Sequence, residues 1–228
     1  MKRALKLWLK RLQFHTPLRR RMVHRYDYFF WPAELAFLCE AMEQSVKDGG
    51  AVLEVGCAQG ATTVFLNNHL TWAQRYHGLR QEVDYACLDT FSGFLPEHAS
   101  YEQKHRGKAS VAYDAYQFNS PEWFKYMLAI NDVTRVQVHQ GDAARFDYGR
   151  LGPIAFCLLD VDLYLPTLAA LPRIYEQLRP GGLIVVDDCA PDQIYDGARQ
   201  AYVEFCAKLG RETDIQHRKF GLLGKPVV

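Results

Sequence analysis

The sequence predicts an α/β fold in which a mostly parallel sheet carries helices on both faces. Two apolar runs support this prediction, residues 154–159 and residues 183–186, and both are short, aliphatic and uncharged. Strands of this kind are buried on both faces, which is typical of parallel sheets. Between the two runs, apolar residues recur at helical spacing until Pro180, Gly181 and Gly182 stop the helix. This order predicts a strand–helix–strand unit with a right-handed crossover.

The other elements follow the same alternation of short apolar runs and helical patterns. Strands are expected at residues 51–55, 83–88 and 136–139, and an antiparallel hairpin at residues 214–226. Helices are expected at residues 32–42, 61–69, 121–130, 166–178 and 197–209. Pro172 falls inside one of these helices, so we expect a kink or a split there.

The length of the chain, 228 residues, suits one α/β domain with an extension. We expect residues 1–45 to form a basic helical extension or cap, and residues 46–228 to form the α/β domain. Residues 92–120 are polar with little periodicity, and such a segment is usually a lid or a disordered insert. No apolar run approaches the ~20 residues that a transmembrane helix needs.

The first 25 residues are strongly basic, whereas the rest of the chain is acidic. Nine of the 27 basic residues precede the first acid, Asp27, which leaves 18 basic residues against 26 acids and a net charge near −8. Four apolar side chains in this segment share one helical stripe: Leu5, Trp8, Leu9 and Leu12. A basic amphipathic helix of this kind packs on its own domain, packs on a second subunit to form a homo-oligomer, or lies on an anionic membrane.

We expect a cytoplasmic protein, either free or attached to the inner face of the membrane through residues 1–25. Lys6 and Lys10 interrupt any signal-peptide core. The six cysteines are scattered without a C-x-x-C pair, as in reduced proteins of the cytosol. Because the basic residues cluster at one end and no RNA- or DNA-binding motif is visible, we expect no nucleic-acid partner.

Three aspartates follow the two apolar runs that predict the sheet. Asp160 ends the first run, and Asp187 and Asp188 end the second. In open parallel sheets ligands bind outside the carboxyl ends of strands, and crowded carboxylates need a cation to stay ionised. Oxygen ligands suit a hard divalent ion such as magnesium. We therefore expect a metal site, and the alternative is that Asp188 or Asp162 only caps the next helix or turn.

A glycine-containing loop joins the strand at residues 51–55 to the next helix. Gly56 and Gly60 allow a ligand to approach the backbone closely, as in nucleotide-binding turns, although the loop lacks G-x-G-x-x-G. Glu54 precedes the first glycine by two residues. The alternative is an ordinary turn with Glu54 bonded to nearby backbone.

Two further aspartates follow other strands of the same sheet. Asp89 is placed to accept both hydroxyls of a ribose bound over the glycine-containing loop. Asp142 follows the third strand, where an adenine ring would lie, and either it or a neighbouring amide is placed to bond that ring. A simple turn is the alternative for each.

Longer motifs resemble a known family. The pattern E-x-G-x-A-x-G resembles motif I of class I S-adenosylmethionine (SAM)-dependent methyltransferases, with Ala58 in place of the middle glycine. The segments DTFSGF, LLDVDLYLPTLAALPRIYEQLRPGGLIVVDD and GARQAYVEF together resemble the macrocin/mycinamicin-type sugar O-methyltransferases, from about residue 50 to the C-terminus. The resemblance implies a Rossmann-like class I methyltransferase fold, with a seven-stranded, mostly parallel sheet and one reversed edge strand. It also implies SAM and Mg²⁺ as cofactors and a sugar hydroxyl as the acceptor.

The resemblance assigns roles to individual residues. The family's three metal-binding aspartates match Asp160, Asp187 and Asp188. The similar catechol O-methyltransferases imply that Thr62 meets the methionine carboxylate and that Asp89 meets the ribose. The expected cofactor site also includes a further set of residues: Glu54, Gly56, Ala58, Gly60 and Asp142.

The expected mechanism is direct displacement of the methyl group by a metal-activated hydroxyl. Asp160 is then both a metal ligand and the general base. His98 or His105 from residues 92–120 is the alternative base, although such histidines are more often solvated. Asp162 is the less favoured metal ligand.

The expected function is therefore SAM-dependent and divalent-metal-dependent O-methylation of a sugar in a glycan or a glycosylated natural product. A metal-independent small-molecule methyltransferase and a non-catalytic cofactor-binding scaffold are the alternatives. Insensitivity to a chelator would favour the first, and absence of turnover the second. The basic, aromatic N-terminus favours a surface-polysaccharide or lipid-linked glycan acceptor over a diffusible antibiotic.

Overall fold

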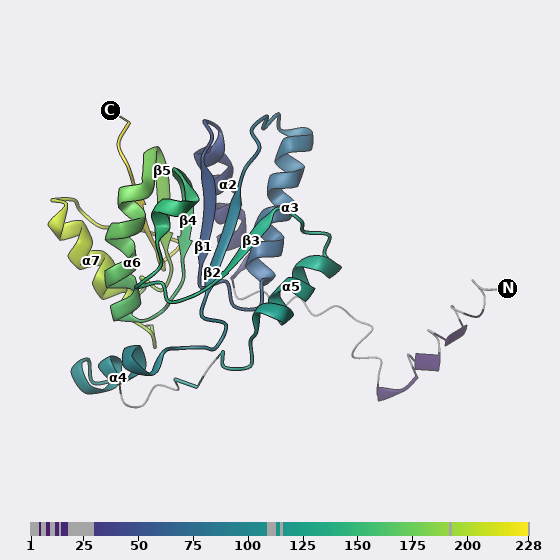
Figure 1. The fold of residues 1–228 in the computed structure, drawn as a ribbon, viewed down its shortest axis with the longest axis horizontal. Helices are drawn as coiled ribbons and strands as arrows, with labels where there is room; N and C mark the ends of the chain where they lie inside the picture. Colours follow the sequence, from purple (N-terminus) through teal and green to yellow (C-terminus); the bar gives the residue numbers. More distant parts are fainter. Residues whose placement is uncertain are drawn as a thin grey trace.

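The computed structural model describes residues 30–108, 113–114, 116–191 and 193–227, together with residues 5, 8, 9, 12, 13 and 15–17. The strands in these ranges form one sheet in the order β3-β2-β1-β4-β5-β7-β6 (Figure 1). Their bounds are β1 (Ala51–Val55), β2 (Tyr85–Asp89), β3 (Val136–Gln140), β4 (Ile154–Leu159), β5 (Leu178–Val186), β6 (Asp214–Gln216) and β7 (Phe220–Gly224). The first five strands are mutually parallel, and β7 runs antiparallel to β5 and β6. This confirms the mostly parallel seven-stranded sheet and the C-terminal hairpin.

Helices cover both faces of the sheet. Their bounds are α2 (Pro32–Val46), α3 (Ala61–Tyr76), α4 (Pro96–His105), α5 (Pro121–Ile130), α6 (Tyr164–Gln177), α7 (Gly197–Lys208) and the 3₁₀ helix η2 (Tyr148–Leu151). Buried residues of α2, α3 and α5 form one core cluster with one face of the sheet. Buried residues of η2, α6 and α7 form the second cluster on the opposite face.

The central strands are apolar because both of their faces are covered. Every residue of β1 and β4 is buried. Neighbouring side chains of β4 enter different clusters: Phe156 packs with the first and Cys157 with the second. The alternation follows from the two-residue repeat of a strand, which sends successive side chains to opposite faces.

Three helices differ from the sequence-based expectation, and the first is α2, which continues to Val46 instead of ending at residue 42. Helix α3 continues to Tyr76 instead of ending at residue 69, because Leu70 and Ala73 extend its fully buried stripe. The expected split at Pro172 does not occur, and α6 is continuous through that residue. Leu171 and Ile174 on either side are fully buried in the second core cluster, so both halves of the helix pack against the sheet.

The expected irregular segment of residues 92–120 contains the helix α4. The sequence gives no periodic signal there because α4 is held by polar contacts, described below, and contributes no side chain to either core cluster. Residues 109–112 and 115 lie outside the described residues. The role of this segment as a lid, and the boundary at residue 45, remain predictions.

The N-terminal apolar stripe is partly described. Leu5, Trp8, Leu9 and Leu12 have helical backbone conformation and are 47–57% exposed. Lys6 and Lys10 lie outside the described residues. In the part of the chain that the structure describes, no helix has the length and hydrophobicity to cross a membrane.

Candidate active site

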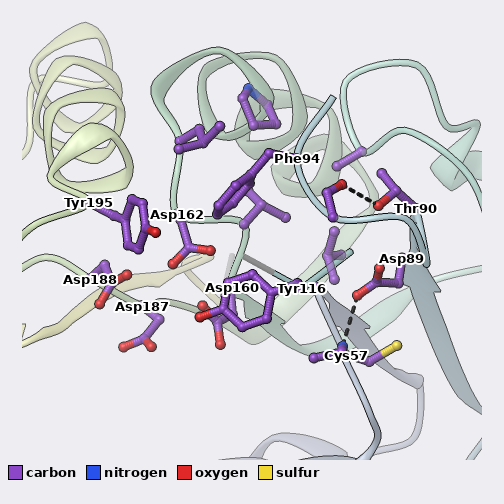
Figure 2. A pocket seen from close by; sticks show the side chains of 18 of the residues that line it. Cys57, Asp89, Thr90, Phe94, Tyr116, Asp160, Asp162, Asp187, Asp188 and Tyr195 are labelled. Carbon is purple, nitrogen blue, oxygen red and sulfur yellow. Dashed lines mark hydrogen bonds between the residues drawn. The ribbon is translucent and has the colours of Figure 1, made fainter. Parts of the chain in front are cut away.

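One large pocket opens at the carboxyl ends of the parallel strands (Figure 2). Its volume is about 380 Å³, within the range of small-molecule sites. It is lined by the loops that follow β1, β2, β3, β4 and β5, and by residues of the segment between β2 and α5. The pocket is therefore lined by every residue that the sequence assigns to the cofactor or the metal, apart from Gly60, the N-cap of α3.

The loop after β1 has a left-handed backbone at three positions. The φ angles are +86° at Gly56, +44° at Ala58 and +87° at Gly60. A β-carbon at residue 60 would lie 2.9 Å from the Phe124 ring, so only glycine fits there without a shift of that ring. The left-handed conformation costs an L-residue about 1–2 kcal/mol, which explains why a glycine would be less strained than Ala58.

Asp89, at the end of β2, holds this loop in place. Its two carboxylate oxygens accept hydrogen bonds from the backbone N–H of Ala58 (2.8 Å) and of Phe91 (2.7 Å). On the other side of the loop, the Asn119 side chain donates to the Ala58 carbonyl. Asp89 thus lines the pocket from a fixed position, and its role toward a ribose stays a prediction.

Glu54 lies beneath the same loop and is only 2% exposed. Its Oε2 atom accepts hydrogen bonds from Thr63 Oγ1 (2.7 Å) and Tyr85 Oη (2.8 Å), so its partners are side chains and not nearby backbone. Burial raises the pKa of Glu54 to about 7, although these hydrogen bonds act in the opposite direction. Glu54 therefore stabilises the base of the pocket as well as lining it.

The remaining cofactor candidates lie at the first turn of α3 and after β3. Thr62 lines the pocket beside the free N–H groups of this helix N-terminus. Asp142 Oδ1 accepts from the Ala144 N–H at 2.9 Å. Its buried Oδ2 makes no hydrogen bond to any residue that the structure describes, and the Nε of Arg145 lies 3.4 Å away. A buried acceptor of this kind is suited to an N–H donor on a ligand.

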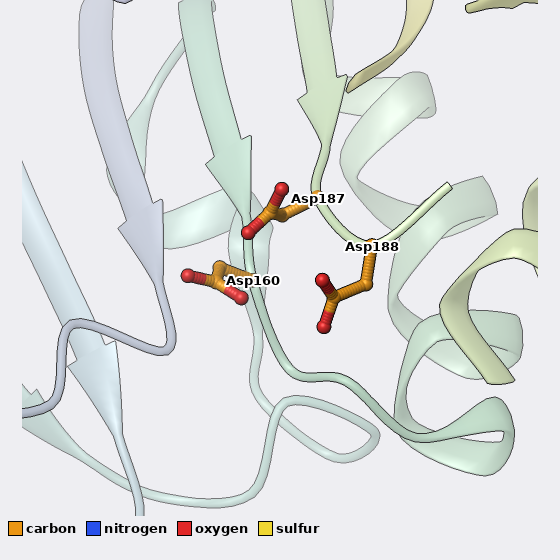
Figure 3. A group of neighbouring side chains, drawn as sticks. All are labelled: Asp160, Asp187 and Asp188. Atoms are coloured by element: carbon orange, nitrogen blue, oxygen red, sulfur yellow. The ribbon is translucent and has the colours of Figure 1, made fainter. Parts of the chain in front are cut away.

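The three aspartates converge at the ends of β4 and β5, as predicted (Figure 3). One carboxylate oxygen from each of Asp160, Asp187 and Asp188 lies within 4.8 Å of the others. The pairing of Leu159 with Val186 brings Asp160 and Asp187 side by side. Asp188 has a left-handed φ of +58°, which ends the strand and allows its carboxylate to join the pair.

Crowding and burial make this cluster unfavourable without a cation. Burial and the neighbouring carboxylates raise the pKa of Asp160 well above its usual range and that of Asp187 to about 7. Oxygen atoms on opposite sides of a bound Mg²⁺ are separated by roughly 4 Å, twice its ~2.1 Å bond length. The spacing and the all-oxygen composition of the three ligands therefore fit a hard divalent ion.

Two more charged residues lie at the acidic cluster. Asp162 lines the same pocket, has a left-handed φ of +60°, and belongs to none of the ligand sets within 4.8 Å among the described residues. Burial and a hydrogen bond with Asp188 raise the pKa of Asp162. Lys219, from the turn before β7, places its Nζ 2.9 Å from Asp187 Oδ1. The sequence-based reasoning did not assign a role to Lys219.

An aromatic wall of Phe94, Tyr116 and Tyr195 lines the same pocket as the acidic cluster (Figure 2). The Phe94 ring centroid lies 5.7 Å from that of Tyr116 and 5.4 Å from that of Tyr195. The three residues come from separate segments, so no spacing in the sequence links them. His98, expected to be solvated, is in fact only 7% exposed and lines this pocket. His105 is exposed and stacks on Tyr101, which removes it from the candidate bases.

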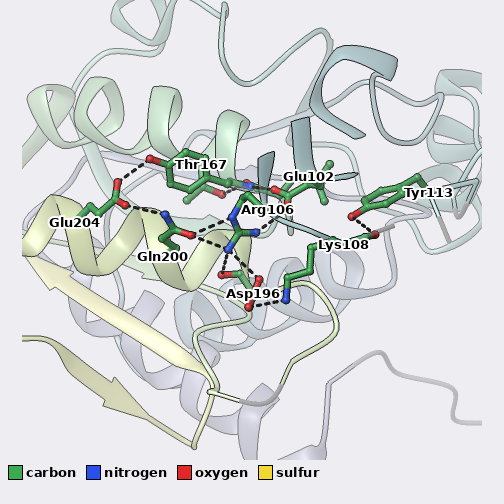
Figure 4. Close-up of polar contacts among 10 residues, drawn as sticks. Glu102, Arg106, Lys108, Tyr113, Thr167, Asp196, Gln200 and Glu204 are labelled. Carbon is green, nitrogen blue, oxygen red and sulfur yellow. Dashed lines mark hydrogen bonds and ion pairs between the residues drawn. The ribbon is translucent and has the colours of Figure 1, made fainter. Parts of the chain in front are cut away.

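Helix α4 is attached to the rest of the domain by a network of charges (Figure 4). Arg106 donates to Glu102 and, at 2.9 Å, to Asp196 Oδ1 just before α7. Lys108 donates to the other oxygen of Asp196 at 2.8 Å. Glu102, which is 2% exposed, also accepts from the N–H of Tyr164 at 2.7 Å. This network ties the segment that carries His98 to the first turns of α6 and α7.

A family model matches the sequence over most of the chain. The model of the macrocin-O-methyltransferase (TylF) family matches residues 33–218. The chain belongs to the macrocin O-methyltransferase family. It is therefore a SAM-dependent O-methyltransferase with the class I, Rossmann-like fold. No curated protein sequence matches the chain significantly.

Solved structures share the fold of this O-methyltransferase. The O-methyltransferase NovP superposes with a TM-score of 0.69 at 18% identity, over 85% of this chain and 79% of that chain. CalS11, a calicheamicin methyltransferase also described as a TDP-rhamnose 3′-O-methyltransferase, has a TM-score of 0.64 at 19% identity, over 96% and 90% of the two chains. SMU.1697c, a putative methyltransferase from Streptococcus mutans solved in complex with S-adenosylhomocysteine (SAH), has a TM-score of 0.50 at 13% identity. The match covers 86% of this chain and 97% of that chain.

Proposed function

We propose that this O-methyltransferase methylates a sugar hydroxyl of a glycan or glycosylated natural product, with a divalent cation held by Asp160, Asp187 and Asp188. The observation that carries the proposal is the single pocket shared by the loop after β1 and the three carboxylates. A family named for macrocin O-methylation, and a neighbour described as acting on TDP-rhamnose, support a sugar acceptor.

The cofactor is proposed to lie across the carboxyl ends of β1, β2 and β3. The N-terminus of α3, with Thr62, suits the methionine carboxylate because its free N–H groups carry partial positive charge. Asp89 suits the ribose hydroxyls, and Asp142 Oδ2 suits the adenine amino group. SAM supplies an electrophilic methyl group, so the six buried, free cysteines need no part in the reaction.

A divalent cation at the acidic cluster would act as a Lewis acid that lowers the pKa of the acceptor hydroxyl. The three aspartates would hold this cation in the pocket that they share with the loop after β1, and the aromatic wall of Phe94, Tyr116 and Tyr195 would restrict the access of water. The acceptor is proposed to lie between the two. Its hydroxyl is then held near the methyl donor. This positioning lowers the barrier to methyl transfer, because the two groups no longer have to meet by diffusion.

Two aspartates are candidates for the base, and His98, which also lines the pocket, stays the alternative. Asp160 is the residue that the sequence favours, but its carboxylate belongs to the ligand set. Asp162 lines the same pocket without belonging to that set. The variants Asp160→Asn and Asp162→Asn separate the roles. Loss of a metal ligand weakens Mn²⁺ binding and turnover together, whereas loss of the base abolishes turnover and leaves Mn²⁺ binding intact.

Methyl transfer from radiolabelled SAM to a panel of glycosides and nucleotide sugars tests the function. We expect the labelled methyl group on a sugar oxygen. Methyl transfer should be lost in EDTA and should recover when excess Mg²⁺ is added. Full transfer in EDTA would support the metal-independent alternative. SAM binding without transfer to any hydroxylated acceptor would support the scaffold alternative.

The N-terminal segment is proposed to bring the enzyme to an anionic membrane that presents a lipid-linked glycan. The exposure of Leu5, Trp8, Leu9 and Leu12, together with the nine basic residues before Asp27, supports this proposal. Sedimentation with phosphatidylglycerol vesicles should retain the full chain but not a chain lacking residues 1–21. Equal sedimentation would exclude membrane contact, and a change of oligomeric state on truncation would indicate a subunit contact instead.

A further inference from the structure

The turn between β6 and β7 places a lysine against the acidic cluster. His217 and Arg218 have left-handed φ angles of +49° and +65°, which reverse the chain directly before Lys219. The carbonyl of Lys219 accepts a hydrogen bond from the N–H of Cys189 at 2.7 Å. Cys189 follows Asp188 directly, so the backbone of this turn is bonded to the segment that carries two of the three metal-binding candidates.

The side chain of Lys219 is fixed from two directions. Its Nζ lies 2.9 Å from Asp187 Oδ1, and the two side chains are only 16% and 6% exposed. The same Nζ lies 4.6 Å from the centre of the Phe30 ring and 5.5 Å from that of Phe220. An ion pair this buried is screened far less by solvent than a surface pair, and the two aromatic faces favour the cation further.

Lys219 is the only lysine or arginine among the described residues that line the pocket. Four carboxylates line the same part of the pocket: Asp160, Asp162, Asp187 and Asp188. With all of them ionised, the lysine cancels one of four negative charges. A divalent cation bound by three of these carboxylates would lie within a few ångströms of the ammonium group, which repels it.

We propose that Lys219 is the internal counter-ion of the acidic cluster, holding Asp187 in its ligand position while lowering the affinity of the cluster for a divalent cation. Lys219 is thus a positioning residue that acts through Asp187. The inference rests on the proposed metal site. The direction of the affinity effect follows from Coulomb repulsion between an ammonium group and a doubly charged ion at short range.

The test is Mn²⁺ binding to the full-length protein in the absence of SAM, measured by electron paramagnetic resonance at pH 8.5. Lys219→Met removes the charge but keeps a flexible apolar stem between the two phenylalanines, and we expect it to bind Mn²⁺ at least tenfold more tightly than the wild type. Lys219→Arg retains the charge and should bind within about threefold of the wild type. Lys219→Gln gives the same comparison if the methionine variant does not fold.

Lys225→Met is the matched control. Lys225 also lies over an aromatic ring, 5.6 Å from the centre of Tyr175, but it does not line the pocket. The Lys225→Met substitution changes the net charge of the protein by the same amount as Lys219→Met. Because residue 225 is outside the pocket, the Mn²⁺ affinity of Lys225→Met should stay at the wild-type value. An equal gain of Mn²⁺ affinity in Lys225→Met would show that the net charge of the protein, and not the position of Lys219, sets the affinity. This result would overturn the proposal.

A second readout is the unfolding temperature. Without its counter-ion the cluster should be less stable in EDTA, so Mn²⁺ should raise the unfolding temperature more in Lys219→Met than in the wild type. Mn²⁺ binding by folded Lys219→Met that is equal to or weaker than that of the wild type would overturn the proposal. Failure of the metal site itself is recognised separately, because Asp187→Asn would then leave the Mn²⁺ binding of the wild type unchanged.

Discussion

The backbone carbonyl of Asp160 lies directly against the α-carbon of Gly56, so the loop after β1 touches the first residue of the acidic cluster. The contact follows from the sheet, because Val55 pairs with Leu159 and the N–H of Asp160 donates to the Val55 carbonyl at 2.8 Å. The loop assigned to the cofactor and the cluster assigned to the metal are therefore in direct backbone contact.

Gly56→Ala should disrupt both halves of the site. A β-carbon at residue 56 would overlap the Asp160 carbonyl, and the φ of +86° is itself unfavourable for alanine. We expect a loss of about 3 kcal/mol or more in the free energy of unfolding, from overpacking and backbone strain together. Denaturant unfolding and calorimetric titration with S-adenosylhomocysteine measure the two effects.

Gly78→Ala is the control for that variant. Gly78 has a similar φ of +74°, but nothing lies within 4 Å of the position of its β-carbon. It should therefore lose only the backbone contribution of about 1–2 kcal/mol and bind S-adenosylhomocysteine normally. Equal losses in the two variants would show that the contact between Gly56 and Asp160 is unimportant.

Glu54→Gln should change the pH dependence of stability. The pKa of Glu54 rises from 4.5 to about 7 in the folded protein, so the folded state binds the proton more tightly than the unfolded state. Stability contributed by this proton is fully present below pH 4.5 and is lost as the pH rises to 7, by about 3 kcal/mol. Glu54→Gln, which remains neutral, should lack this loss.

The measurement is the free energy of unfolding of both proteins in EDTA from pH 4.5 to pH 8. The advantage of the wild type over Glu54→Gln should shrink across this window. Glu82→Gln, at an exposed position, should run parallel to the wild type. If Glu54→Gln also ran parallel to the wild type, the buried carboxyl would not bind its proton as proposed.

Arg106→Ala should loosen helix α4. Arg106 bridges the buried Glu102 and Asp196, and its side chain is only 10% exposed. Removing it leaves Glu102 buried with a single remaining described donor, the N–H of Tyr164, so we expect a loss of about 2 kcal/mol or more. Amide hydrogen exchange should become faster in residues 96–105.

Arg145→Ala provides the comparison, because Arg145 also contacts α4, through Glu97 at 3.5 Å, but its side chain is 76% exposed. An exposed pair of this kind contributes about 0–1 kcal/mol. Unchanged exchange in α4 of Arg106→Ala, or an equal effect in Arg145→Ala, would contradict the importance of the buried network.

Asp142→Asn should weaken cofactor binding. The substitution replaces an acceptor oxygen facing the pocket with an amide that must rotate to present its oxygen. We expect the affinity for S-adenosylhomocysteine to fall about tenfold, which corresponds to the loss of one hydrogen bond. Asp147→Asn is the control, because Asp147 is exposed and, within the described ranges, accepts only from the N–H of Gly149. If the wild type, Asp142→Asn and Asp147→Asn bound S-adenosylhomocysteine with equal affinity, the adenine would not be hydrogen-bonded to Asp142.

The parts of the fold that depend on local pattern were predictable from the sequence. The apolar runs of β1 and β4 identify strands because both faces of the sheet are covered. The hairpin at residues 214–226 was also predicted. The convergence of Asp160 with Asp187 was also predictable, since parallel neighbours end at the same edge of a sheet. Helix α4 was missed because polar contacts with α6 and α7 stabilise it, and these contacts are distant in sequence.

The rest of the site depends on tertiary contacts that no spacing encodes. Lys219 reaches Asp187 across 32 residues of chain, and Phe94 meets Tyr195 across about a hundred. Glu54 was assigned to the cofactor from its place before Gly56, but its hydrogen bonds to Thr63 and Tyr85 appear only once α3 and β2 are packed beside it. Lys219 lies in the turn of the hairpin beside Arg218, so nothing in the local sequence distinguishes it from a solvated turn residue.

The most direct test of the account is anomalous diffraction at the manganese edge from crystals grown with Mn²⁺ and S-adenosylhomocysteine. We predict one strong peak bounded by the carboxylates of Asp160, Asp187 and Asp188, next to the homocysteine sulfur. Full occupancy of S-adenosylhomocysteine with no manganese peak between these three side chains, at saturating Mn²⁺, would contradict the central claim.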